Sequence, residues 1–248
     1  MLVKIAVTVL VTFALCWQPF LSDPEQALQV LRRVFPVARG LFEFYLSSAV
    51  TLLAVAPSSL KLLKKPTFWH FKLSLVNSSL GFFLFSYQVH EKSILLVALP
   101  VCLLLNDLPL IAIWFLQVST FSMLPLLLKD GLLVPYAVTS VAFVCIGIYL
   151  LSAMERCTEA QLHLDAYRRL TKWLPAWNLA RIVRRKFYVS VVLMVALSVA
   201  SAALPPPAAL PDLFPVLVSA VSFVHFLGTF VYFNVIQLST GRDRQKNK

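Results

Sequence analysis

Long apolar runs separated by short polar segments dominate this chain and limit the folds open to it. The chain is 59% hydrophobic and only 13% charged, whereas a soluble domain carries about 25% charged residues. A helix needs about 20 residues to cross the hydrocarbon core of a bilayer. The sequence therefore predicts an all-α polytopic membrane protein, a single transmembrane domain over residues 1–248 with about eight transmembrane helices. The candidate spans are residues 2–17, 44–63, 71–87, 93–105, 108–128, 132–154, 187–204 and 214–238.

Two of these spans have alternatives. Residues 2–17 could also be a signal peptide, but the bulky residues Leu15, Cys16 and Trp17 lack a small-residue cleavage pattern. A first membrane span is therefore the preferred interpretation. The run 93–105 is short and ends at a polar turn, residues 106–109, so it either crosses fully or forms a tilted half-span.

The basic residues predict how the chain is oriented. If the spans alternate, 16 of the 22 lysine and arginine residues fall on one side, in the segment 61–72, the loop 155–187 and the tail 239–248. Because cytosolic loops carry such an excess, we predict that 155–187 and 239–248 are cytosolic and that the loop 18–43 is luminal. The apolar residues within 155–187 would let that loop lie on an anionic lipid surface. The net charge of +11 could instead indicate nucleic-acid binding, but the charges lie in short loops and not on one soluble face.

One short polar segment on the predicted luminal side concentrates ionisable groups. His90, Glu91 and Lys92 separate the runs 71–87 and 93–105. An imidazole can relay a proton near neutral pH, and a lysine, or an arginine such as Arg39 in the other luminal segment, can bind a phosphate. Groups at the level of lipid head groups indicate recognition of a phosphorylated lipid. The alternative is ordinary anchoring, because juxtamembrane Arg and Lys commonly snorkel to head groups, and Glu91 could simply pair with Lys92 or Arg39.

The remaining candidates for chemistry give weaker signals. The four cysteines show no metal-ligand spacing, so neither a disulfide framework nor a metal site is predicted. No nucleotide-binding glycine loop or serine nucleophile elbow is present, and no cofactor is expected. We expect His225, within the last span, to be a hydrogen-bonded packing residue, and His70 to contact solvent on the cytosolic side. Asn77 begins an N-glycosylation pattern but lies inside a span, so it should be unused.

Three segments carry a family resemblance. They are RRVFPVARGLFE at 32–43, FFLFSYQVHEKSILL at 82–96 and STFSMLPLLLKD at 119–130. They resemble signature segments of the endoplasmic-reticulum α-1,3-glucosyltransferases that use dolichyl-phosphate glucose, and the resemblance covers nearly the whole chain. It implies a partial GT-C type fold in the endoplasmic reticulum membrane, with the active face toward the lumen.

The resemblance also implies an activity in protein N-glycosylation. Members of this family transfer glucose, with inversion, from dolichyl-phosphate glucose to a dolichyl-pyrophosphate-linked high-mannose oligosaccharide in α-1,3 linkage. The implied partners are this donor, this acceptor and membrane lipids, with no nucleic acid. By resemblance, His90, Lys92 and Arg39 would contact the donor phosphate and Glu91 would orient them. Gln88 favours the branch that adds the first glucose, because the sister branch that adds the second typically has histidine there.

Two departures from the family pattern bear on activity. The family's general base is an aspartate in an upstream luminal loop, and Met1 aligns midway through the family sequence. We therefore expect that aspartate to lie outside this chain, which leaves its catalytic residue unknown. A block that the family carries after Glu43 is also missing, because Glu43 runs directly into Phe44. A non-catalytic membrane fragment is thus an alternative. A transporter is less favoured, because the charges gather at span ends and no internal repeat is visible.

Overall fold

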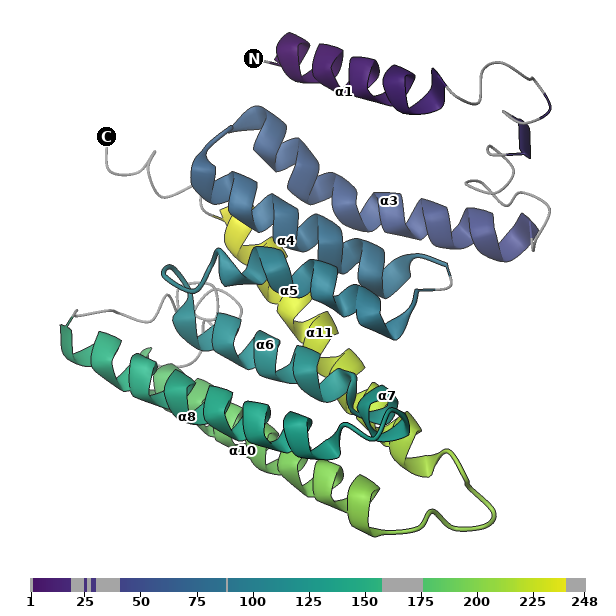
Figure 1. Ribbon diagram of the computed structural model, residues 1–248. Coiled ribbons are helices and arrows are strands. Elements are labelled where there is room, and N and C mark those ends of the chain that lie inside the picture. The colour runs from purple at the N-terminus through teal and green to yellow at the C-terminus, as the bar shows by residue number, and fades with distance from the viewer. Residues whose placement is uncertain are drawn as a thin grey trace. The chain divides into compact units, whose positions relative to one another are not determined.

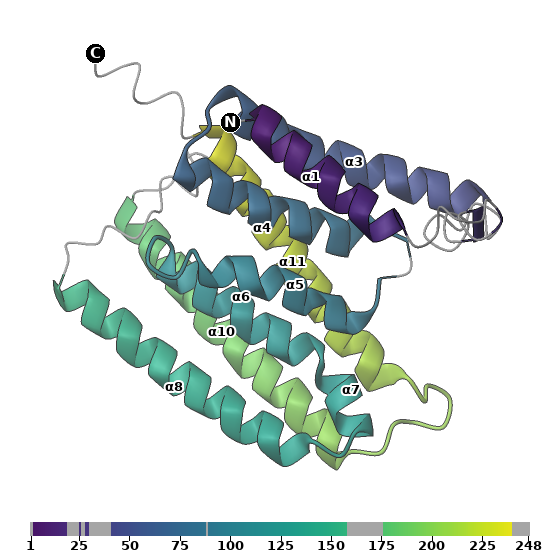
Figure 2. The same ribbon diagram turned by 45° about the horizontal axis from the view of Figure 1, so that its top comes forward.

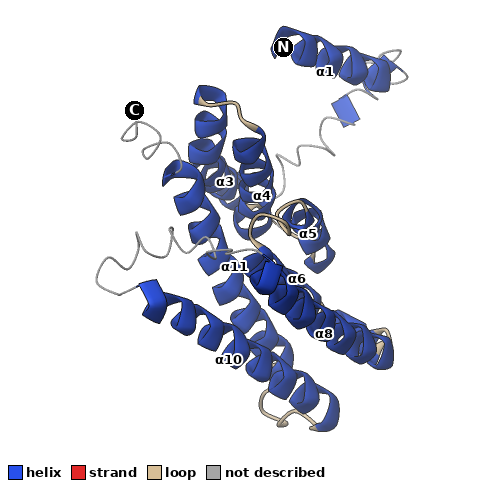
Figure 3. Cartoon of the chain, turned by 90° about the vertical axis from the view of Figure 1, so that its left-hand side faces the viewer, coloured by secondary structure: helices blue, strands red, loops and turns tan. Residues whose placement is uncertain are grey.

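The elements of this protein are helical throughout the part of the chain that the structure describes. A computed structural model describes residues 2–18, 25, 28–29, 41–87, 89–157 and 176–239, with side chains for 7–18, 25, 28–29, 46–87, 89–152 and 182–239. Figure 3 shows only helices and connecting loops in these ranges. Contacts divide the chain into two units, residues 1–49 and 50–248, and each is described by itself.

Every candidate span corresponds to a helix or a pair of helices. The helices are α1 (Leu2–Trp17), α3 (Leu41–Lys64), α4 (Phe68–Phe85), α5 (Ile94–Cys102), α6 (Pro109–Ser122), α7 (Leu124–Lys129), α8 (Leu133–Cys157), α10 (Ala176–Ala203) and α11 (Leu213–Ser239). Within the described residues, four segments are long and apolar enough to cross a bilayer: Leu46–Lys64, Leu133–Ser152, Ile182–Ala203 and Leu213–Ser239. The predicted all-helical, multi-pass character is confirmed.

Helices α6 and α11 organise the packing of the second unit. α11 packs against α4, α6, α7 and α10, while α6 also packs against α5 and α8. In Figures 1 and 2, α11 passes behind α4, α5 and α6. Phe115 and Phe121 of α6 and Phe233 of α11 are almost fully buried and form part of one apolar core. This core is continuous from α4 to α11.

The run 108–128, expected as one span, is broken into α6 and α7 at Met123. Pro125 explains the break, because proline has no N–H to donate to the carbonyl oxygen of Phe121, four residues earlier, and its ring clashes with that carbonyl, whereas proline is tolerated in the first turn of the new helix α7. α7 then ends in a Schellman motif: the N–H of Leu132 donates to the carbonyl oxygen of Leu127 (2.8 Å), and that of Gly131 to Leu128 (3.2 Å). Gly131 has φ +71°, a conformation that glycine adopts without strain.

The short helix α5 returns the chain to the beginning of α4. After Cys102, the backbone continues in tight turns, with Leu103 N–H donating to the Pro100 carbonyl oxygen (3.1 Å) and Leu104 N–H to Val101 (2.9 Å). Nine α-helical residues rise about 14 Å, and five residues in such tight turns add about 10 Å. This suffices to match the roughly 20 Å of α4 between Lys72 and Phe85. The run 93–107 therefore reaches back along the length of α4, and Asp107 meets Lys72.

α10 begins well before the span predicted at 187–204. It starts at Ala176 and includes four of the basic positions that were assigned to the loop 155–187: Arg181, Arg184, Arg185 and Lys186. α8 likewise continues to Cys157. Arginine and lysine are good helix formers. A run of basic residues therefore lowers the hydropathy on which the predicted span was based, but the helix continues through it. The expectation that 1–248 forms a single transmembrane domain stays a prediction.

Close packing at Gly81 gives a first testable consequence. A Cβ at this position of α4 would lie 2.9 Å from Val55 Cγ2 of α3, and small residues allow such close helix approach in membrane proteins. We expect Gly81→Ala to destabilise the chain by about 1–2 kcal/mol, because the branched valine cannot easily move aside. Thermal unfolding in detergent, followed by circular dichroism, measures the effect.

Gly228→Ala is the matched control for Gly81→Ala. A Cβ on Gly228 meets nothing within 4 Å, and alanine is favoured over glycine in a helix by about 1 kcal/mol. Its melting temperature is expected to stay level or rise. A fall equal to that of Gly81→Ala would contradict the close-packing explanation.

Candidate functional site

The predicted luminal cluster forms a capped turn between α4 and α5. α4 ends at Phe85, where the Ser86 N–H donates to the Phe82 carbonyl oxygen (3.1 Å). The short 3-10 helix η2 (Glu91–Ser93) follows, and His90 is its N-cap. His90 Nδ1 accepts a hydrogen bond from the Lys92 backbone N–H (3.3 Å). Because Nδ1 accepts, the neutral ring carries its proton on Nε2, which is then a hydrogen-bond donor.

All three charged or titratable side chains of this turn are exposed. His90, Glu91 and Lys92 lie at the surface, and among the described residues no ion pair joins Glu91 to Lys92. Arg39 and Gln88, which the sequence grouped with this turn, lie outside the described residues. The turn therefore presents one N–H donor, on His90, and one ammonium group, on Lys92, two positions apart, an arrangement that can bind an anion such as a phosphate.

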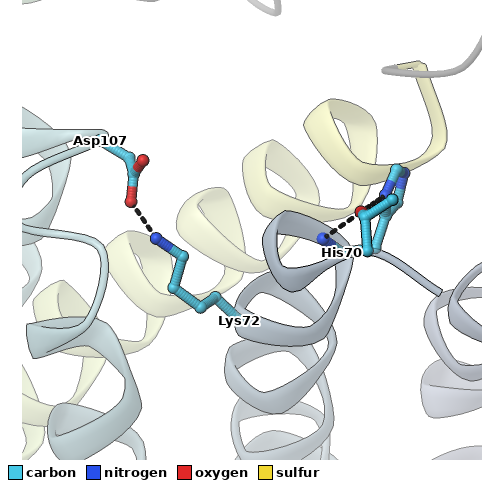
Figure 4. Close-up of polar contacts among 4 residues, drawn as sticks. His70, Lys72 and Asp107 are labelled. Atoms are coloured by element: carbon cyan, nitrogen blue, oxygen red, sulfur yellow. Dashed lines mark hydrogen bonds and ion pairs between the residues drawn. The ribbon is translucent and has the colours of Figure 1, made fainter.

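The other ends of α4 and α5 are held together by an ion pair. Lys72 of α4 bonds to Asp107, which lies between α5 and α6 (Figure 4). The Lys72 side chain is only 10% exposed, against 35% for Asp107. Lys72 Nζ also lies 5.0 Å from the centre of the Phe68 ring and 5.7 Å from that of Trp69, within the range of cation–π contacts. The sequence counted Lys72 only among the basic residues of the segment 61–72 and did not assign a role to Asp107.

His70 is buried, so the expectation that it contacts solvent is wrong. Its side chain is 4% exposed, and its Nδ1 lies 2.6 Å from the Oγ1 of Thr67, the N-cap residue of α4. Burial lowers the pKa of His70, and the positive charges of Lys61 and Lys65 lower it further. The ring is therefore neutral at pH 7. Figure 4 shows His70 and Lys72 directed to different sides of the first turns of α4. The beginning of α4 is thus held on one side by the His70–Thr67 contact and on the other by the Lys72–Asp107 ion pair.

A buried amide at the end of α11 joins three helices. Gln237 is 0% exposed. Its Oε1 accepts from Ser58 Oγ (2.6 Å) and Asn77 Nδ2 (2.8 Å), and its Nε2 donates to the carbonyl oxygens of Ser58 (3.1 Å) and His70 (3.3 Å). An amide side chain has two acceptor sites and two donors, and all four are used. α3, α4 and α11 are thus linked near the predicted cytosolic end of the second unit.

Asn77, the first residue of the N-glycosylation pattern, belongs to the same hydrogen-bond network. It is 0% exposed, and its Oδ1 accepts from Asn234 Nδ2 (3.2 Å) while its own Nδ2 donates to Gln237. An acceptor for glycosylation must lie on an exposed loop. The expected burial of Asn77 inside a helix is confirmed.

A second polar chain links α6, α10 and α11. Trp114 Nε1 donates to Ser190 Oγ (3.0 Å), Ser190 Oγ lies 2.8 Å from His225 Nε2, and His225 Nδ1 lies 2.7 Å from the Val221 carbonyl oxygen. The consistent assignment has His225 Nδ1–H donating to Val221 and Ser190 donating to His225 Nε2. His225 is therefore a hydrogen-bonded packing residue, as expected.

These features define a class of protein, a multi-pass helical membrane protein stabilised by buried polar contacts, with an exposed turn of ionisable residues between two of its helices. The sequence profile described as the ALG6, ALG8 glycosyltransferase family matches residues 1–50 and 44–232. The chain belongs to this family.

Curated relatives cover the whole chain. A relative from Gallus gallus is 47% identical over 275 aligned residues, which cover 100% of this chain and 54% of the relative. A relative from Mus musculus is 46% identical, and the alignment covers 98% of this chain and 54% of the relative. Both are named dolichyl pyrophosphate Man9GlcNAc2 alpha-1,3-glucosyltransferase. A Drosophila melanogaster relative, named as a probable enzyme of that kind, is 39% identical, and the alignment covers 96% of this chain and 51% of the relative.

The matches also bear on the two departures from the family pattern. The family profile matches in two pieces that overlap at residues 44–50, beside Glu43 and Phe44, where we expect from the sequence that a family block is missing. The alignment with the Gallus gallus relative extends over 275 residues, more than the 248 of this chain. The chain spans about half the length of the curated relatives it matches.

Proposed function

We propose that this chain serves the transfer of glucose from dolichyl-phosphate glucose to a dolichyl-pyrophosphate-linked high-mannose oligosaccharide, at the luminal face of the endoplasmic reticulum membrane. The observation that carries the proposal is the 47% identity, over the full chain, to a relative named for that acceptor and that linkage. The first glucose, added to the nonamannosyl acceptor, is the step favoured, because the relatives' printed name specifies Man9GlcNAc2.

The donor phosphate is proposed to bind at the turn between α4 and α5. When the sugar leaves dolichyl phosphate, negative charge develops on the phosphate oxygens, and fixed donors or cations nearby lower the barrier. Exposed His90 can donate from Nε2, since its Nδ1 is already used by the Lys92 backbone, and the Lys92 ammonium adds a positive charge. Glu91 would orient Lys92 or Arg39, and Arg39 would supply a second cationic group. The attacking acceptor hydroxyl must also lose its proton to a general base, a role that is not assigned to a residue here.

The test is a transfer assay with the chain reconstituted in vesicles, together with dolichyl-phosphate glucose and the nonamannosyl acceptor. Addition of one hexose, detected by mass spectrometry, supports the proposal. The same assay on the full-length Gallus gallus relative, changed at the positions aligned with His90 and Lys92, tests the site. We expect each alanine substitution to lower kcat/KM by about 10- to 100-fold, which corresponds to about 1.4 to 2.7 kcal/mol of lost phosphate stabilisation.

Lys129→Ala, at its aligned position, is the matched control, because Lys129 is an exposed basic residue at a helix end outside the turn. Its activity is expected to be unchanged. Full activity after both His90 and Lys92 changes would remove the proposed phosphate site. If the chain is inactive while the relative is active in the same assay, the alternative of a non-catalytic membrane fragment is favoured. If hexose is added only to an acceptor that already carries one glucose, the sister branch is favoured.

A further inference from the structure

A groove between α6, α10 and α11 is left unexplained by the proposed glucose transfer. Its volume is about 690 Å³, and its walls are mainly apolar, with Val189 and Leu193 on α10 and Val224 on α11. Gly228 of α11 also lines it, and a Cβ there would meet nothing within 4 Å. The groove is therefore open space bounded by apolar side chains, of a size suited to a small ligand or a lipid chain.

Two cationic side chains lie at one end of this groove. Arg185 and Lys186 both line it, one turn before Val189 and Ser190 on the same face of α10. Both are exposed, and neither has an ion pair or hydrogen bond to another described residue. The neighbouring Arg184 points elsewhere, because it lines a separate small cavity with Leu110 and Ile148.

The polar side chains that line the groove between α6, α10 and α11 offer few unsatisfied groups. Trp114 Nε1, Ser190 Oγ and both nitrogens of His225 are used in the chain of hydrogen bonds that ends at Val221. A sugar or peptide would need partners for its own polar groups, which these saturated side chains do not supply. An acyl chain has no such need, and the stretch of α10 from Ile182 to Leu193 offers it about 16 Å of length.

We propose that this groove binds an anionic glycerophospholipid, with an acyl chain along α10 and α11 and the phosphate on Arg185 and Lys186. By the distribution of basic residues, this end is cytosolic, opposite to the turn at His90. The site is thus separate from the proposed donor site and does not depend on the proposed transfer reaction. Each basic side chain is expected to favour an anionic over a zwitterionic head group by roughly fivefold.

Trp114 lines the groove and can report on it. In a chain with Trp17, Trp69, Trp173 and Trp177 changed to phenylalanine, Trp114 is the only tryptophan. Vesicles would contain phosphatidic acid or phosphatidylcholine with identical brominated acyl chains, which quench tryptophan on contact. We expect stronger quenching by brominated phosphatidic acid at equal mole fraction, with a relative binding constant of at least about fivefold.

Variants separate the groove from the general membrane surface. Arg185→Gln with Lys186→Gln should reduce the preference to near one, while Arg184→Gln, the matched control next to them, should leave it unchanged. Gly228→Leu should fill the groove and reduce quenching by both lipids. Equal quenching by the two lipids, or equal effects of the Arg184 and Arg185/Lys186 changes, would overturn the proposal.

A second measurement needs no tryptophan replacement. Native mass spectrometry of the detergent-solubilised chain should show retained phosphatidic acid adducts, and these should be weakened at least about fivefold by Arg185→Gln with Lys186→Gln but not by Arg184→Gln. Adducts that are insensitive to both charge changes and to Gly228→Leu would locate the lipid outside the groove and refute the assignment.

Discussion

Gln237→Leu is expected to lower the unfolding free energy of the chain by about 2–3 kcal/mol, because it removes four buried hydrogen bonds worth about 0.6 kcal/mol each in membrane proteins. The leucine has a similar volume, so the change tests polar contacts more than packing. Ser58 Oγ keeps a contact with Ser74 Oγ (3.2 Å), but Asn77 Nδ2 loses its acceptor inside the core, which adds a desolvation cost. Reversible unfolding in mixed detergent micelles measures the difference.

Gln117→Leu provides the control for that measurement. Gln117 is also buried, at 7% exposure, and its Oε1 has no hydrogen-bond partner within the described part of the chain. The same chemical substitution is therefore expected to be neutral or slightly stabilising there. If both glutamine changes destabilise the chain equally, the loss at Gln237 reflects volume or helix propensity, and the three-helix network is not what holds α3, α4 and α11 together.

The helices were predictable from the sequence because hydropathy depends only on local composition. Long apolar runs predicted each named α-helix in the described part of the chain, down to the short run at 93–105. What hydropathy could not give was the helix ends. α10 extends back to Ala176 through a basic stretch, because charged residues can continue a helix beyond the hydrocarbon core. The break at Met123 was missed because Pro125 lies within an otherwise apolar run.

The contacts of polar residues between helices were much less predictable. The Lys72–Asp107 pair joins residues 35 positions apart, and Gln237 bonds Ser58 of α3, 179 positions away. Nothing local in the sequence gives such pairings. A usable signal did exist: Asn77, Asn234 and Gln237 are amides within apolar helices, and polar groups in such places are expected to bond to one another. His70 was misjudged because its position near several lysines resembled a surface, whereas the helix packing buries it.

The exposed turn at His90 was located from sequence, but its geometry was not. The sequence placed a base, an acid and an ammonium group between two spans. The structure adds that His90 caps η2 through Nδ1, which fixes the tautomer and turns Nε2 into the donor. It also leaves Glu91 unpaired with Lys92 among the described residues, so the charges of the turn do not neutralise one another directly.

The Lys72–Asp107 pair predicts an unequal effect of removing either partner. Asp107→Asn should destabilise the chain by about 2 kcal/mol, because it leaves the Lys72 ammonium, 10% exposed, without a counter-charge. Contacts with the Phe68 and Trp69 rings recover only part of the loss. Lys72→Met should cost less than about 1 kcal/mol, because methionine can pack against those rings, and Asp107, 35% exposed, can turn to solvent.

The double variant decides between this explanation and simple loss of a contact. The double variant with Lys72→Met and Asp107→Asn should be more stable than Asp107→Asn alone, because Lys72→Met removes the buried charge that Asp107→Asn leaves unpaired. Asp130→Asn, an exposed aspartate at the end of α7, should have no measurable effect on the same unfolding curves. If Lys72→Met proves more destabilising than Asp107→Asn, the lysine contributes chiefly through its aromatic contacts, and the ion pair is not what fixes the α5–α6 connection to the start of α4.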